Sequence, residues 1–445
     1  MDDLTAMLEA IGVASVQELF SDIPKEVLLD RELRLPGPLA EWELLSHLRT
    51  MASRNVSTVE MPHFLGAGCY DHHVFAAAQS LLSRGEFLTA YTPYQPELSQ
   101  GTLQAMFEFQ SYVCRLTGMD VANSSMYDGA TALGEAVFMA QRILPTRPRV
   151  IISGAVHPHY RAVVRTVTKP LDLEILEVRP DPCWNTDWDQ ILRLVTEGTC
   201  CVVLQSPNFF GTIEELDGMA MVVEKTHALG ALVVFVVVET TSLGLLKPPG
   251  ELGADIVVGE GQPLGLPMAF GGPHLGLFAT RGDLLRQMPG RLVGRTKDSR
   301  GSTGYVLTLA TREQHIRRER ATSNICTNQS LCALAMTVHL ALLGPSGLRA
   351  LARRCAQLAH QAMEALSRLP GLEIRQRRVY NEFVVKTPVE PRRINEALLK
   401  KGMLGGLDLG RMDKSWDGHW LVCFTEKHTS EQVRDLAEAV SEVLG

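Results

Sequence analysis

The feature that most constrains the fold is a series of short, apolar, β-branched runs between residues 149 and 259. Five such runs, RVIISG, LEILEV, CCVVLQS, ALVVFVVV and ADIVVG, are bounded by turn residues and separated by helix-like segments. Continuous apolar strands that alternate with helices are typical of a parallel sheet covered on both faces. A sixth run, LGLFATRG, indicates a later strand of the same sheet. We therefore predict an α/β fold built on a large, mostly parallel sheet.

The length of 445 residues favours two or three domains. Residues 1–62 predict an N-terminal helical arm, because their helical apolar patterns are broken by prolines and supply too little for a core. Residues 63–310 predict the large α/β domain. Residues 311–445 predict a helical connection, with long helical patterns at 328–343 and 346–368, and then a smaller C-terminal α/β domain.

Composition excludes several classes of function. The net charge of −7 gives no reason to expect nucleic acid or an acidic membrane as a partner. The N-terminus lacks the basic and apolar regions of a secretory signal, and no window has the roughly 18 apolar residues that a membrane helix needs. The nine cysteines form no CxxC pattern, which favours reduced thiols. We expect a cytoplasmic protein.

The stretch from residue 91 to 132 predicts part of a cofactor site. Its first half, YTPYQPELSQG, places aromatic rings, hydroxyls and a carboxylate on a loop stiffened by prolines. A helix is expected over 101–117. The second half places Ser124, Ser125, Gly129 and Thr131 at an expected helix start, where free backbone N–H groups favour an anion.

Two further residues are candidates because they follow strands. His157 comes after RVIISG, at the end of the sheet where open α/β folds bind ligands, and a pocket role and a structural role are equally supported. Glu239 ends ALVVFVVV, where a carboxylate can meet a cofactor's ring nitrogen, although a cap or ion pair is the favoured reading. The pairs His157/His159 and His72/His73 lack the helical i, i+4 spacing of zinc ligands, so no metal centre is expected.

A basic run near residue 315 leaves two readings open. Arg312, Arg317, Arg318 and Arg320 precede the polar trio of residues 322–324, which suggests an anion site made of guanidinium and hydroxyl donors. The alternative is a solvated helix face with glutamates as neighbours. The hydroxyl groups after the run favour the anion site.

Several long motifs resemble one family. YTPYQPELSQG, MDVANSSMYDGATAL, VVLQSPNFFGTIEEL, DIVVGEGQPLGLPMAFGGPHLG and TREQHIRRERATSNICTNQ are similar to the glycine decarboxylase P-protein of the glycine cleavage system. The resemblance runs from about residue 35 to the C-terminus. The length matches the N-terminal half of that protein, which many bacteria make as a separate chain, subunit 1. The resemblance implies the fold-type-I architecture of transferase-like enzymes that depend on pyridoxal 5′-phosphate (PLP).

The resemblance also implies that this chain has lost the PLP lysine. In the family, the turn after a late strand carries a lysine that binds PLP covalently, whereas the matching turn here reads GEGQPLG. PLP would then be bound by the partner, subunit 2. A vestigial pocket would remain in this chain, made of Ser125, His157, Glu239, Gln262 and Pro263.

Across the interface, the resemblance implies that this chain completes the partner's active site. The residues that would reach the substrate are Tyr91, Thr92, Tyr94, Gln95, Glu97 and Ser99, and those that would touch the cofactor phosphate are Thr322, Ser323 and Asn324. The tyrosines would orient the substrate or relay protons, and interface packing is an equal alternative. Glu97 would act as acid or base if burial raises its pKa.

The implied reaction is that of glycine dehydrogenase (aminomethyl-transferring, decarboxylating). Glycine would lose CO₂, and its aminomethyl group would pass to the lipoyl arm of the H-protein. The implied assembly is an α₂β₂ heterotetramer with subunit 2. Two alternatives stay open: a non-catalytic scaffold that stabilises subunit 2, and a stand-alone PLP enzyme that uses Lys247. The absence of lysine from GEGQPLG argues against the second.

Overall fold

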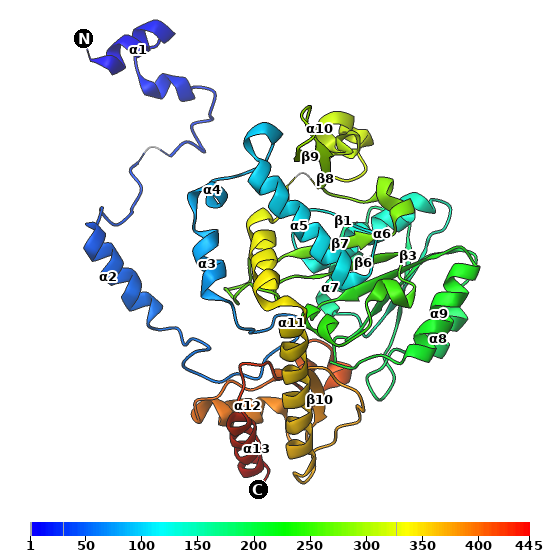
Figure 1. Cartoon of the computed structure of the whole chain (residues 1–445). Helices are drawn as coiled ribbons and strands as arrows, with labels where there is room; N and C mark the ends of the chain where they lie inside the picture. The colour runs from blue at the N-terminus through cyan, green and yellow to red at the C-terminus, as the bar shows by residue number, and fades with distance from the viewer. Residues whose placement is uncertain (1, 30, 326) are drawn as a thin grey trace. The chain divides into compact units, whose positions relative to one another are not determined.

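A seven-stranded sheet is the largest sheet of the computed structural model among its described residues (Figure 1). The structure describes residues 2–29, 31–325 and 327–445, and it divides into two compact units, 1–57 and 58–445. The strand order is β1-β7-β6-β5-β4-β2-β3. These strands are β1 (Val121–Ala122), β2 (Arg149–Ser153), β3 (Glu174–Val178), β4 (Thr199–Gln205), β5 (Leu232–Val237), β6 (Ile256–Glu260) and β7 (Gly276–Thr280).

The pairing of the strands confirms the predicted, mostly parallel sheet. Strands β3, β2, β4, β5 and β6 are parallel to one another, whereas β7 runs antiparallel to β6 and β1 antiparallel to β7. All six apolar runs of the sequence form strands of this sheet, from β2 to β7. Residues 64–73, FLGAGCYDHH, form a loop before the sheet and contain no helix and no named strand.

Helices cover both faces of the sheet, which explains why its central strands carry apolar side chains on both faces. In β5, Val233 and Phe235 belong to one core, while Val234 and Val236 belong to the other. Helices α5, α8, α9 and α11 contribute to the first core, and α6 and α7 to the second. Their bounds are α5 (Gln100–Thr117), α6 (Gly129–Ile143), α7 (Pro158–Thr168), α8 (Trp188–Leu194), α9 (Leu216–Ala228) and α11 (Ser330–Ser367).

Helix α11 connects the two halves of the larger unit and is kinked. Gly344 has non-helical backbone angles and Pro345 follows it, so the two helical patterns predicted at 328–343 and 346–368 form one interrupted helix. By length and composition alone α11 is apolar enough to cross a membrane, so the expectation that no window of the sequence reaches this level is wrong for this helix. Its N-terminal half packs in the core of the large sheet, which accounts for that composition.

A small sheet follows α11. Its order is β10-β12-β11, all antiparallel, and α12, α13 and the second half of α11 pack against it around a separate core. The bounds are β10 (Glu382–Lys386), α12 (Pro391–Lys400), β11 (Leu407–Asp408), β12 (His419–Cys423) and α13 (Ser430–Leu444). The sequence did not predict the hairpin of β8 (Leu292–Lys297) and β9 (Thr303–Thr308), because its strands are polar and partly exposed.

The N-terminal unit contains α1 (Asp3–Ile11) and α2 (Glu41–Ala52). Among its described residues none is buried, in keeping with a segment too small for a core. The shorter helices α3 (Ala76–Leu82), α4 (Gly85–Leu88) and α10 (Gln314–Arg317) belong to the larger unit. The domain boundaries proposed at 62/63 and 310/311 stay predictions.

Gly211 offers a test of the packing between the two sheets. Its φ is 83°, and a Cβ atom there would lie 1.8 Å from the backbone oxygen of Glu382 in β10. We expect Gly211→Ala to lower the free energy of unfolding by about 3 kcal/mol, from backbone strain and overpacking together.

The matched control is Gly301→Ala, because Gly301 has the same φ of 83° and open space around it. This control should lose only the strain, about 1 kcal/mol. Urea unfolding followed by tryptophan fluorescence measures both. Equal losses would contradict the steric explanation.

Candidate functional site

The predicted pocket at the carboxyl end of the large sheet is filled by this chain's own loop, residues 64–73. Tyr70 is buried and exchanges two backbone hydrogen bonds with the Gln262 side chain, of 3.1 and 2.8 Å. The Tyr70 hydroxyl donates to Oε1 of Glu382 at 2.6 Å, and the backbone N–H of Ala67 donates to Oε2 of the same carboxylate at 2.9 Å. The loop is thus fixed both to the large sheet and to β10.

His157 lies against this loop at the start of α7. Its Nε2 donates to the backbone oxygen of Ala67 at 2.8 Å, and its Nδ1 accepts from the N–H of His159 at 3.1 Å. A Cβ atom on Gly68 would come within 2.5 Å of the His157 ring, so the loop backbone packs directly against it. Burial lowers the pKa of His157 to about 4, which keeps the ring neutral.

Glu239 faces a histidine of the same loop. Its carboxylate accepts from His72 Nε2 at 3.0 Å, from Asn381 Nδ2 at 3.1 Å and from the N–H and hydroxyl of Thr241. The other nitrogen of His72 contacts Glu426 at 2.6 Å. Burial alone lowers the pKa of His72, but the two carboxylates outweigh it and hold the pKa well above its usual value. His72 is therefore a buried cation between two carboxylates.

The start of α6 is also occupied by a side chain of this protein. The predicted helix start at Gly129 is confirmed, and its N–H donates to Oε2 of Glu260 at 3.1 Å. Oε1 of Glu260 accepts from the N–H groups of Gln262, at 3.1 Å, and Leu275, at 2.8 Å. The anion expected at this helix start is thus the buried carboxylate of Glu260.

The remaining pocket residues hold the surrounding backbone. Gln262 also donates to the backbone oxygen of Leu266 at 2.9 Å. Pro263 is buried in the turn after β6. The hydroxyl of Ser125 accepts from the N–H of Gln329 at 3.1 Å, so the contacts of Ser125 are with the segment before α11. Lys247 is exposed in the loop beyond β5.

These residues do not fit a covalently bound PLP in this chain. The turn after β6 offers Gln262 and Pro263 where the chemistry needs an amine, and the loop of residues 64–73 occupies the space beside His157. A cation, His72, already faces the carboxylate of Glu239, and a carboxylate already caps α6. The pocket is a self-contained polar network.

The loop from Tyr91 to Ser99 differs from this pocket because its side chains face outward. Tyr91 is 75% exposed and Tyr94 is 69% exposed. Gln95 and Glu97 are exposed as well, and Ser99 is half-buried. The predicted substrate-contacting residues therefore form an accessible surface.

The buried side chain of Arg291 contacts this loop and holds it in place. The buried guanidinium donates to the Thr92 hydroxyl at 3.3 Å and lies 5.8 Å from the centre of the Tyr94 ring. Its Nε lies 3.7 Å from Glu313, next to the basic run. Arg291 thus links two predicted groups of residues that are more than 200 positions apart in the sequence.

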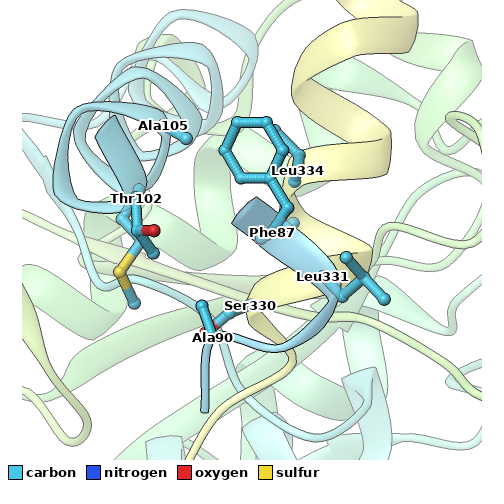
Figure 2. A pocket seen from close by; sticks show the side chains of 9 residues that line it. Phe87, Ala90, Thr102, Ala105, Ser330, Leu331 and Leu334 are labelled. Atoms are coloured by element: carbon cyan, nitrogen blue, oxygen red, sulfur yellow. The ribbon is translucent and has the colours of Figure 1, made fainter. Parts of the chain in front are cut away.

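Apolar packing holds the base of the same loop. Figure 2 shows Phe87 of α4 beside Leu334 of α11, with Ala90, the residue before Tyr91, near Ser330. Beyond the loop, the side chain of Gln100 donates to the backbone oxygen of Tyr305 at 2.9 Å and accepts from its N–H at 2.9 Å. Both ends of the loop are anchored on packed elements.

The three predicted phosphate-contacting residues have different surroundings. The N–H of Thr322 donates to the backbone oxygen of Arg312 at 2.9 Å, and its side chain lines a basic pocket. The Ser323 hydroxyl donates to Glu135 of α6 at 2.9 Å. Asn324 is exposed.

The family model described as glycine cleavage system P-protein matches residues 1–440. The chain belongs to the glycine cleavage system P-protein family.

Relatives and solved structures narrow this assignment. The chain is 49% identical to a probable glycine dehydrogenase (decarboxylating) subunit 1 of Thermomicrobium roseum over 99% of this chain and 98% of the relative. It is 49% identical to the protein of the same description from Desulfitobacterium hafniense, over 100% and 98% of the two chains. This chain corresponds to subunit 1 of the enzyme glycine dehydrogenase (decarboxylating).

The structural neighbours confirm the predicted fold class. A crystal structure of glycine decarboxylase (P-protein), in inhibitor-bound form, has a TM-score of 0.89 and 43% identity, covering 100% of this chain and 98% of that chain. A glutamate decarboxylase of Lactobacillus brevis has a TM-score of 0.70 at 12% identity, over 96% and 97% of the two chains, and shows the fold alone. The architecture is that of the fold-type-I PLP enzymes.

Sequence reasoning missed four residues that organise the site: His72, Glu260, Arg291 and Glu382. His72 was considered only as a metal ligand. It lies with Cys355 and Glu426 in a group whose ligand atoms fall within 4.8 Å of one another, and hydrogen bonds join these side chains directly. The other three lie in strands or loops without any local signal, because their partners are distant in sequence.

The buried carboxyl of Glu382 gives a prediction for pH dependence. Burial raises its pKa to about 7, above the ordinary value of 4.5. Between pH 4.5 and 7 this carboxyl loses its proton in the unfolded chain but keeps it in the folded chain. The free energy of unfolding of the parent protein therefore falls as the pH rises through this range. We expect Glu382→Gln to gain stability relative to the parent by roughly 3 kcal/mol between pH 4.5 and pH 8.

Chemical unfolding at several pH values measures this difference, with the value at the lowest pH as the baseline. Glu396→Gln, on the exposed face of α12, serves as the control and should leave the pH profile unchanged. A Glu382→Gln profile parallel to that of the parent would show that this carboxyl is already ionised below pH 5.

Proposed function

We propose that this chain decarboxylates glycine together with subunit 2, in an active site that both chains form. PLP is bound covalently by subunit 2, and the aminomethyl group that remains after CO₂ leaves passes to the lipoyl arm of the H-protein. The observation that carries this proposal is the contrast between the pocket at the carboxyl end of the large sheet and the loop of residues 91–99. This chain's own pocket is filled by residues 64–73, while the loop of residues 91–99 is exposed on a fixed base.

In this proposal PLP supplies the electron sink for decarboxylation. The residues of this chain bind and orient the reactants. Tyr91 and Tyr94 carry phenol groups that hold glycine in place or relay a proton, and Glu97 accepts or donates a proton once the interface buries it. Thr92, Gln95 and Ser99 supply further polar contacts from the same loop.

The fixed position of the loop is what this chain adds to catalysis. Arg291 contacts Thr92 and Tyr94 from beneath, and Gln100 pins the end of the loop to Tyr305. Groups that are already held in place lose little freedom when the substrate binds, and this lowers the barrier. A loop positioned in this way suits contact with a substrate held by another chain.

The segment of residues 322–324 is proposed to contact the phosphate of the partner's PLP. Thr322 and Asn324 carry most of this role, because the Ser323 hydroxyl already donates to Glu135. The assembly that places both surfaces at the partner is proposed to be an α₂β₂ heterotetramer in the cytoplasm. The name subunit 1 of the relatives supports a partner subunit.

Variants in the loop of residues 91–99 distinguish a catalytic role of this chain from the role of a non-catalytic scaffold. We expect Tyr94→Phe and Glu97→Gln to lower glycine–bicarbonate exchange by the assembled complex by about 10²-fold each, as is usual when a proton-transfer group is lost. Both side chains are exposed in this chain, so its own stability should not change.

The control variant is Tyr305→Phe, because Tyr305 contacts Phe107 through its ring and donates no side-chain hydrogen bond among the described residues. It should leave the exchange rate unchanged. Size-exclusion chromatography with subunit 2 verifies assembly for all three variants. Parent-like rates for Tyr94→Phe and Glu97→Gln would favour the non-catalytic scaffold.

The location of PLP has a separate test. The complex is incubated with PLP, reduced with borohydride, separated and analysed by mass spectrometry. We expect a pyridoxyl group on a lysine of subunit 2 and none on this chain, because the turn after β6 contains Gln262 and Pro263 in place of lysine. A pyridoxyl group on Lys247 would contradict this expectation and favour the alternative of a stand-alone PLP enzyme.

A further inference from the structure

Three metal-binding side chains meet at the junction between the large sheet and the C-terminal sheet. His72, Cys355 and Glu426 each offer a ligand atom, and these atoms all lie within 4.8 Å of one another. His72 and Cys355 are buried, and the Glu426 side chain is 16% exposed. Imidazole, thiolate and carboxylate are the ligands that Zn²⁺ takes in proteins. The group therefore has the chemistry of a transition-metal site.

The three residues belong to separate parts of the chain. His72 lies on the loop of residues 64–73, Cys355 on the second half of α11, and Glu426 between β12 and α13. Glu426 is 354 positions from His72 and 71 positions from Cys355, so no spacing in the sequence indicates the group. An ion bound to all three would join the loop to two elements that pack around the C-terminal sheet.

The distances within the group are close to those that a tetrahedral ion needs. With Zn–N and Zn–O bonds of about 2.0 Å and a Zn–S bond of about 2.3 Å, the ligand atoms lie roughly 3.3 to 3.5 Å apart. The distance of 3.5 Å between Cys355 Sγ and Glu426 Oε2 fits this range. The distance of 2.6 Å between His72 Nδ1 and the same oxygen is that of a hydrogen bond. It lengthens by roughly 0.7 Å when an ion replaces the proton.

Other groups hold two of the ligands in orientation. The Nε2–H of His72 donates to Glu239 at 3.0 Å, which is the carboxylate–histidine pairing that supports many metal-bound histidines. Oε1 of Glu426 accepts from the backbone N–H of His73 at 2.7 Å, and Oε2 faces the group. Because part of the Glu426 side chain is exposed, an ion can enter from this side.

The charge of the group suits a divalent ion. Burial alone raises the pKa of Glu426, but the hydrogen bond and charge of His72 outweigh it and lower the pKa to about 2, so this side chain is a carboxylate. Burial raises the pKa of the Cys355 thiol to about 11. A bound Zn²⁺ displaces the thiol proton and the proton on Nδ1 of His72, and both go to solvent. Two positive charges enter and two leave, so the net charge of the buried network is unchanged.

A neighbouring histidine lacks a partner. Both ring nitrogens of His339, on the first half of α11, are buried without a hydrogen-bond partner among the described residues. Burial lowers the pKa of His339 to about 4, and the charges of His72 and Glu426 also act on it, which places the ring near the group. Buried polar groups without partners are rare. A water molecule held by an ion in the group would give this ring a partner.

From these observations we propose that His72, Cys355 and Glu426 bind one divalent transition-metal ion, with Zn²⁺ as the best match to the three ligands. A water molecule takes the fourth position. The ion stabilises the junction between the loop of residues 64–73 and the C-terminal sheet, and in the metal-free chain the protonated His72 takes its place. This site goes beyond the proposed function and does not depend on the shared active site.

The experiment is a titration of the isolated full-length chain with Co²⁺, a spectroscopic substitute for Zn²⁺. The chain is first treated with a chelator and kept reduced with a phosphine. We expect saturable binding of one Co²⁺ per chain, with the near-ultraviolet absorption of a thiolate bound to cobalt. Added Zn²⁺ should displace Co²⁺ and remove this absorption, which gives the affinity for Zn²⁺ by competition.

Two conservative variants test the ligands. Cys355→Ser should abolish the thiolate absorption and weaken Zn²⁺ binding by about 100-fold or more, because loss of even a supporting residue costs about 10- to 100-fold. Glu426→Gln keeps the size of the side chain and should also weaken binding by about 100-fold. The matched control is Cys332→Ser, since Cys332 is another buried cysteine of α11 outside the group. It should bind both ions as the parent does.

Thermal unfolding of the same proteins gives a second readout. Zn²⁺ should raise the melting temperature of the parent and of Cys332→Ser, and leave that of Cys355→Ser unchanged. If Cys355→Ser does not fold, Glu426→Gln takes its place in this comparison.

Absence of saturable binding by the parent chain would overturn the proposal. Parent-like affinity and absorption in Cys355→Ser would overturn it as well, because the ion would then lie elsewhere. The same holds if Cys332→Ser weakens binding as much as Cys355→Ser. None of these measurements uses subunit 2, so their failure would leave the proposed function untouched.

Discussion

The interaction on which the rest of the structure depends is the buried contact of His72 with Glu239 and Glu426. Removing charges from water is costly, and a buried cation is tolerated only when carboxylates and hydrogen bonds compensate it. Here Glu239 follows the strand β5 and Glu426 follows β12, so the same histidine joins the large sheet to the C-terminal sheet. The loop that carries His72 is thereby locked between the two.

This arrangement satisfies the polar groups at the carboxyl end of the large sheet with side chains of the chain itself. A carboxylate, Glu239, lies just beyond β5, and the N–H groups of the first turn of α6 point out of the helix start. Both are satisfied internally, the first by His72 and the second by Glu260. The inner pocket then serves as structural support, and the outer face, with the loop of residues 91–99 and the basic pocket, is available to other molecules.

The sequence predicted the large sheet well, because β-branched runs such as ALVVFVVV must be buried on both faces. It also located the outward loop, whose prolines and aromatic residues are adjacent in the chain. It did not predict the filled pocket: Tyr70, Gln262 and Glu382 meet through hydrogen bonds across 192 and 312 positions, and no local pattern records such contacts. Arg291 was missed for the same reason, since its role depends on Thr92 and Glu313 lying nearby.

The central claim is that neither chain alone forms the active site. Glycine–bicarbonate exchange should be measured with H-protein and PLP for this chain, for subunit 2 and for an equimolar mixture. The account predicts exchange for the mixture only, with a rate that rises with added subunit and saturates at a one-to-one ratio. Full exchange by subunit 2 alone, or any exchange by this chain alone, would contradict it.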